Sequence, residues 1–165
     1  MRKDLPLSYL GASGHDGRTW YRERMKSVIY LRVASVLTLL HAILHTMGGV
    51  FGKAEPGPQQ AAVAAMKANQ FPLMGVTRSY WSFYRGMGLA VTVFLTIAAL
   101  VFWQLSSLAK TDSGRLRPIY WTFLLGFVAM AVVSYAYFFA APVVVELMIA
   151  ACFGMAIFTS RPAVA

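Results

Sequence analysis

The sequence predicts an all-α protein, a four-helix bundle that spans a membrane and carries one short surface helix. Hydrophobic residues make up 58% of the 165 residues and charged residues only 13%, whereas soluble domains carry about 25% charged residues. A spanning helix needs about 20 mainly apolar residues, since each adds about 1.5 Å across a hydrocarbon core about 30 Å thick. Four apolar runs of this kind account for most of the chain.

We expect membrane spans at residues 27–50, 81–108, 118–140 and 142–159. Pro118 and Pro142 open the third and fourth spans, and proline is tolerated in a first helical turn because the missing N–H would be unpaired there anyway. The link between these two spans, "AAP", is so short that they must form an antiparallel hairpin.

The loop 51–80 predicts a short helix of its own. The segment is Ala-rich over about residues 59–69 and reaches Pro72 shortly afterwards. Helices tend to end before a proline, because the residue that precedes it is pushed toward extended conformations. We therefore expect a helix lying on the outer surface, with a loosely ordered loop as the alternative.

Lysine and arginine set the expected orientation, because cytoplasmic loops carry an excess of both. Eleven such residues lie on one side: Arg2, Lys3, Arg18, Arg22, Arg24, Lys26, Arg32, Lys110, Arg115, Arg117 and Arg161. Three lie on the other side: Lys53, Lys67 and Arg78. We expect cytoplasmic polar tails at 1–26 and 160–165, a single membrane domain at 27–159 and an outward-facing loop 51–80, in the inner (plasma) membrane of a bacterium.

The net charge of +9 raises the question of a nucleic-acid partner. Nucleic-acid-binding proteins gather basic residues on one folded face, whereas here the basic residues lie in short segments between apolar runs. We therefore expect no nucleic-acid partner. The expected partners are membrane lipids and either a larger membrane complex or further copies of the chain.

The ionisable residues inside the spans predict a polar cluster in the outer half of the bundle. His41 and His45 lie in "HAILHTMGG" of the first span, Arg85 in the second and Glu146 in the fourth. Ionisable residues in spans face the bundle interior or a water-filled cavity. Small and hydroxyl residues lie on the same helical stripes, among them Thr38, Gly48, Gly88, Thr92 and Thr96, and such residues mark helix–helix interfaces in membranes.

Three interpretations of this cluster stay open. Arg85 and Glu146 form a buried bridge that pins two spans together, while the histidines bond to neighbouring groups. Alternatively, the cluster lines a pocket for a lipid, a quinone or a small amphiphile. The candidate ligand-binding residues are then His41, His45, Tyr84, Arg85, Tyr135 and Glu146, with Tyr80, Trp81, Phe83 and Tyr137 as further aromatic walls.

The third interpretation is a metal site formed by His41, His45 and Glu146. The i, i+4 spacing of the histidines is weak support on its own, and no "HExxH" motif accompanies it. We therefore expect no metal and no cofactor, with a transition metal or a bound lipid or quinone as the alternative. Cys152, the single cysteine, lies in an apolar run and reads as a small buried hydrophobic residue.

Two motifs, "HxxxHTxGG" at 41–49 and "SYWxFYRGxG" at 79–88, resemble those of a family of small bacterial four-helix integral membrane proteins with no assigned activity. The resemblance implies the four-span fold and an inner-membrane location, and it carries over no catalytic residues. The expected function is that of a non-enzymatic ligand-binding or accessory subunit. The alternatives are a membrane enzyme acting on a lipid-like or quinone-like substrate and a metal-binding protein that uses the two histidines.

Overall fold

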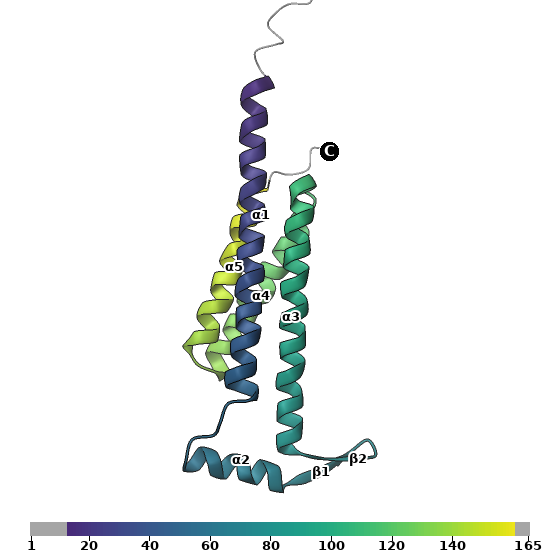
Figure 1. Ribbon diagram of the computed structural model, residues 1–165, viewed down its shortest axis with the longest axis vertical. Coiled ribbons are helices and arrows are strands. Elements are labelled where there is room, and N and C mark those ends of the chain that lie inside the picture. The colour runs from purple at the N-terminus through teal and green to yellow at the C-terminus, as the bar shows by residue number, and fades with distance from the viewer. Residues whose placement is uncertain (1–12, 161–165) are drawn as a thin grey trace, which may run out of the picture. The chain divides into compact units, whose positions relative to one another are not determined.

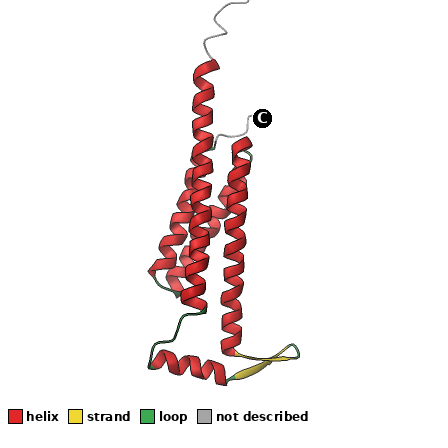
Figure 2. Cartoon of the chain, viewed as in Figure 1, coloured by secondary structure: helices red, strands yellow, loops and turns green. Residues whose placement is uncertain are grey.

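A computed structural model of the protein describes residues 13–160, and it describes side chains from residue 25 onward. The structure is 82% helical, and its described strands form one small hairpin (Figure 2). The all-α architecture that the sequence predicts is therefore confirmed.

Four long helices are apolar enough to cross a membrane (Figure 1). They are α1 (Ser13–Leu44), which continues into a π-helical turn η2 (His45–Val50), α3 (Tyr80–Asp112), α4 (Arg117–Tyr137) and α5 (Ala140–Thr159). Their apolar stretches are Met25–Val50, Tyr80–Asp112, Arg117–Tyr137 and Ala140–Thr159. The four predicted spans are confirmed, with ends that differ by a few residues.

The largest difference lies at the start of α1. This helix begins at Ser13, so residues 13–26, which we expected to belong to a polar tail, are helical before the apolar run starts. Once a helix has started, each added residue gains a backbone hydrogen bond at little further cost. The helix formed by the apolar run can therefore extend into the polar stretch that precedes it. Residues 1–12 and 161–165, the rest of the two predicted tails, lie outside the described residues.

The chain forms two compact units. Unit 1 holds the described residues up to Ser35 and from Val101 onward, and unit 2 holds Val36–Leu100. In unit 1, α4 and α5 form the antiparallel hairpin that the short link predicts (Figure 1). The fully buried ring of Phe102 packs edge-on against Phe123 and Phe153, each 4.7 Å away between centroids. Aromatic packing thus fills the centre of unit 1.

Unit 2 contains the turns of α1 and α3 next to the loop, together with the loop itself. The loop holds α2 (Pro58–Ala68), which lies crosswise to the first turns of α3 (Figure 1). The helix predicted at about 59–69 is therefore confirmed, and the loosely ordered alternative is wrong. Pro58 occupies the first helical position of α2, where its fixed φ favours the helix and its missing N–H costs nothing.

A β-hairpin that the sequence did not predict joins α2 to α3. Strand β1 (Gln70–Leu73) pairs antiparallel with β2 (Val76–Ser79), and Leu73 lies opposite Val76. The two residues between the strands, Met74 and Gly75, have φ angles of 47° and 85°. Positive φ at both positions is what a type I′ turn requires. Such turns usually carry Asn-Gly or Asp-Gly. Here methionine takes the first position, so the sequence lacks the residue pair by which the turn is recognised.

Ser79 caps the N-terminus of α3, directly after the hairpin. Its hydroxyl accepts a hydrogen bond from the backbone N–H of Ser82 at 3.1 Å, as an N-cap residue does for one of the unpaired donors of a first helical turn. The strand β2 therefore passes directly into the helix, without a linker.

Candidate functional site: a polar cluster on α1 and α3

Unit 2 gathers polar side chains where the end of α1 runs beside the start of α3. From here on, the term polar cluster means the part of the predicted cluster that lies in unit 2, together with two threonines: His41, His45, Thr46, Arg85 and Thr92. His45 opens the π-helical turn η2, in which Phe51 donates its backbone N–H to the Thr46 carbonyl, five residues earlier, at 3.0 Å. Single π-turns in helices are rare overall. Those that do occur are found frequently at functional sites.

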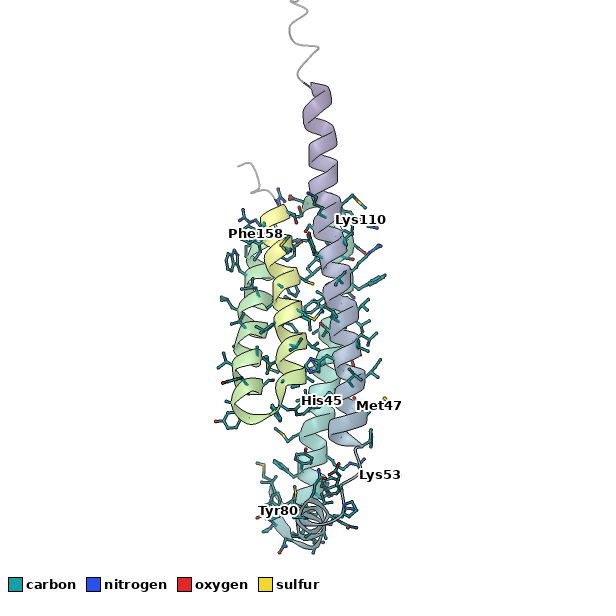
Figure 3. The ribbon with its side chains drawn as sticks, turned by 90° about the vertical axis from the view of Figure 1, so that its left-hand side faces the viewer. His45, Met47, Lys53, Tyr80, Lys110 and Phe158 are labelled. Atoms are coloured by element: carbon teal, nitrogen blue, oxygen red, sulfur yellow. The ribbon has the colours of Figure 1, made fainter. Side chains whose placement is uncertain are left out.

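The imidazole of His45 bonds to α3. Its Nε2 lies 3.1 Å from the carbonyl oxygen of Gly88. A carbonyl only accepts hydrogen bonds, so Nε2 must carry the proton, and in the neutral ring Nδ1 is then an acceptor. The neighbouring Met47 is 67% exposed and lies on a different face of the turn (Figure 3). The half-buried His45 is therefore oriented toward α3 rather than toward lipid.

Two threonines add a second contact between the same pair of helices. The hydroxyls of Thr46 and Thr92 lie 2.9 Å apart. Thr46 also bonds to the Ala42 carbonyl at 2.6 Å and Thr92 to the Gly88 carbonyl at 3.2 Å. Each hydroxyl has one proton to donate, so two protons serve three contacts. The network joins α1 to α3 and can rearrange its protons without moving a side chain.

Gly88 makes this close approach possible. A Cβ atom added at Gly88 would lie only 2.9 Å from Cγ2 of Val50, which is itself 2% exposed. Small residues let helix backbones approach closely in membranes, and here the approach also brings the Gly88 carbonyl within reach of His45.

Two polar atoms of the cluster are buried without a hydrogen-bond partner among the described residues. They are Nδ1 of His41, one turn before His45 on the same face of α1, and Nε of Arg85, one turn before Gly88 on α3. The Arg85 guanidinium lies 4.9 Å from the centroid of the Phe51 ring, a cation–π contact. Buried polar atoms are almost always hydrogen-bonded, so these two require explanation.

Glu146 belongs to unit 1. It is 1% exposed, and its Oε1 accepts a hydrogen bond from the hydroxyl of Ser134 at 2.9 Å. Its second oxygen, Oε2, is buried and has no hydrogen-bond partner in the described part of the chain. The expected bridge between Arg85 and Glu146 joins residues of different units and stays a prediction.

The aromatic residues expected to wall a pocket are placed unequally. In unit 2, Tyr84 is half exposed and stacks on Trp81 at 5.6 Å, and Lys67 of α2 lies 5.5 Å from the same Trp81 ring. In unit 1, Tyr135 and Tyr137 are 82% and 79% exposed. Such exposure does not support a role as pocket walls within their own unit.

The metal interpretation gains no support from unit 2. His41 and His45 supply two imidazoles on one helical face, and because Nε2 of His45 is bonded to Gly88, only Nδ1 of that ring is open to a metal. Within either unit, no three His, Cys, Asp or Glu side chains of the described residues gather as a metal site. The set His41, His45 and Glu146 spans both units and stays a prediction.

Sequence reasoning missed Thr46 and the partners of the other residues. Gly88 and Thr92 lie on the same predicted stripe as Arg85, so the pattern indicates an interface there. Thr46 directly follows His45, in the π-helical turn η2, and its hydroxyl contacts Thr92 of the same partner helix. A π-turn leaves no signal in helical periodicity.

Comparison with known proteins returned no match, whether with family models, with curated proteins or with solved structures. The resemblance of the two motifs therefore stays a resemblance. The four apolar helices themselves identify a small multi-pass membrane protein.

Gly88 offers a test of the interface. Gly88→Ala should lower the stability of the protein by about 1–3 kcal/mol, because overpacking forces Val50 or the backbone to move. Gly86→Ala is the matched control on the same helix, since a Cβ there meets nothing within 4 Å. Thermal unfolding in detergent, followed by circular dichroism, measures both. Equal melting temperatures for the two variants would contradict the close approach at Gly88.

Proposed function

We propose that this protein is a non-enzymatic ligand-binding membrane protein, and that its polar cluster binds the polar head of an amphiphile such as a lipid or a quinone. The observation that carries the proposal is the pair of buried, unpartnered atoms, Nδ1 of His41 and Nε of Arg85. A head group with oxygen acceptors would satisfy Arg85, and an apolar tail would lie along the lipid-facing surface of the same helices.

Arg85 in particular requires a hydrogen-bond acceptor. Its guanidinium is always charged and carries only donors, and ionisable groups within the membrane are costly unless they are paired. Phe51 contacts the face of the guanidinium but accepts no conventional hydrogen bond. Aromatic side chains with a few fixed polar groups are the usual lining of small-molecule sites. Phe51 contacts Arg85, and Trp81 and Tyr84 precede Arg85 in the first two turns of α3.

The hydrogen bonds of the other cluster residues support a structural role for them beside this ligand. His45, the obvious general base, has its Nε2 bonded to a backbone carbonyl, and the two threonine hydroxyls bond to each other and to backbone carbonyls. These contacts hold α1 to α3, and of the two His45 ring nitrogens only Nδ1 is left as an acceptor. An accessory subunit of a larger complex is compatible with the same site, since the partner could supply the acceptor.

Mass spectrometry of the protein extracted in polymer-bounded lipid discs and then exchanged into detergent tests the proposal. The wild type should retain a bound amphiphile. Arg85→Gln should bind it about tenfold to a hundredfold more weakly, because a hydrogen bond to a charged group contributes about 1.5–3 kcal/mol. Arg115→Gln, which changes an exposed arginine outside the cluster, is the control and should retain the amphiphile.

A wild type that carries no amphiphile would overturn the proposal and favour the bridge between Arg85 and Glu146. The bridge predicts a specific effect on the free energy of unfolding. Removing one member of a buried pair costs about 3–5 kcal/mol, because the other charge is left unpaired. Arg85→Gln and Glu146→Gln should then be strongly non-additive in the double variant, whereas additive effects would exclude the bridge.

We further propose that both termini are cytoplasmic, that the loop 51–80 faces outward and that the membrane is a plasma membrane. The eleven-to-three distribution of lysine and arginine supports this orientation. The expected residence in a bacterial inner membrane rests on the motif resemblance.

Cysteine labelling tests the orientation in a Cys152→Ala background. A membrane-impermeant maleimide should label Ala61→Cys, on the exposed surface of α2, in intact cells. It should label Thr111→Cys, exposed at the end of α3, only after the membrane is made permeable. The reverse pattern would contradict the orientation.

A further inference from the structure

The hairpin formed by β1 and β2 has one apolar face and one polar face. Residues directly opposite each other in an antiparallel pair share a face, and the faces alternate along each strand. The register pairs Phe71 with Arg78 and Leu73 with Val76. One face therefore carries Phe71, Leu73, Val76 and Arg78, and the other carries Gln70, Pro72, Thr77 and Ser79.

The apolar face is turned toward the start of the membrane-spanning helix α3. The ring of Phe71 lies 4.7 Å from the ring of Tyr80 and 5.7 Å from that of Phe83, between centroids. Tyr80 begins α3 directly after β2, and the Ser79 cap fixes that junction. The hairpin therefore joins the first residue of the apolar stretch Tyr80–Asp112, and it extends sideways from that end of α3 (Figure 1).

The outer part of the same face is not covered by the protein. Leu73 and Val76 are 41% and 47% exposed, and Met74 at the turn is 97% exposed. The start of α3 presents further exposed aromatic residues, with Tyr80, Phe83 and Tyr84 each about half exposed. Tyrosine is enriched at membrane–water interfaces, where its ring lies at head-group level.

We propose that the hairpin lies in the interface of the membrane that the chain spans, with Leu73, Met74 and Val76 in the boundary between head groups and acyl chains. Phe71 holds the apolar face toward that boundary. Arg78 shares this face near the base of the hairpin, where its long side chain can reach a lipid phosphate. The polar face, with Gln70 and Thr77, then points toward water.

Charge favours a lipid surface with acidic head groups. The segment 51–79 contains Lys53, Lys67 and Arg78 against a single acid, Glu55, which gives a net charge of +2. Basic residues close to a membrane surface are attracted to anionic lipids. An apolar face with basic residues at its edge is the pattern of interfacial segments in general.

This inference does not depend on the ligand-binding proposal. The hairpin uses residues outside the polar cluster, and its partner is the bilayer itself. Its effect is to fix the depth of the first turn of α3 in the membrane, three to five residues before Arg85.

Spin labels on neighbouring residues of β2 test the proposal, because Val76 and Thr77 lie on opposite faces of the strand. Val76→Cys and Thr77→Cys are each labelled with a nitroxide in a Cys152→Ala background. The full chain is reconstituted into vesicles of phosphatidylethanolamine and phosphatidylglycerol. Collision rates with oxygen, which concentrates in lipid, and with a water-soluble nickel chelate report the depth of each label.

The label at position 76 should collide preferentially with oxygen and the label at 77 preferentially with the nickel chelate, with ratios that differ severalfold. Equal, high access of the chelate to both would show a hairpin in water and overturn the proposal. Shielding of position 76 from both reagents would show a protein partner instead and would also overturn it. A third label at Leu73→Cys, on the apolar face of the other strand, should behave like position 76. Circular dichroism melting of each labelled variant checks that the fold is retained.

Discussion

The absence of water inside a bilayer is the constraint on which unit 2 depends. A polar side chain there must find its partner in the protein or in a ligand, because hydrocarbon offers none. The His45 imidazole meets this demand by donating to the carbonyl of Gly88. That bond is possible only because position 88 has no side chain, so Val50 can pack directly on the α3 backbone. A glycine thus determines where a histidine can lie.

The two units satisfy this constraint differently. Unit 1 is closed by aromatic packing around Phe102 and Phe153, and its buried Glu146 has a hydroxyl partner on one oxygen. Unit 2 contains few fully buried large side chains and instead holds α1 to α3 through a chain of hydrogen bonds from His45 to Thr46. Rearrangement of two protons among three contacts costs little, whereas repacking interlocked rings does not.

The sequence was sufficient for the spans and for α2, because apolar run length, the Ala-rich run and the position of Pro72 act locally. It also predicted that His41, His45 and Arg85 lie near the helix ends that adjoin the loop 51–80. It could not supply their partners. The Gly88 carbonyl is a backbone group, so nothing in the residue type marks it as an acceptor. The π-turn at His45 and the type I′ turn at Met74 and Gly75 depend on backbone geometry that residue patterns only weakly encode.

The segment "HAILHTMGG" illustrates how one spacing can carry two different roles. His41 and His45 share a face of α1, yet only His45 has a hydrogen-bond partner identified in unit 2, and Nδ1 of His41 is left unsatisfied. A purely structural pair would leave no such atom, since an unmade bond in the interior costs about 1–3 kcal/mol. Arg85 Nε is left in the same condition on the facing helix. Unsatisfied polar atoms on both helices of unit 2 support the proposal that a bound amphiphile completes this site.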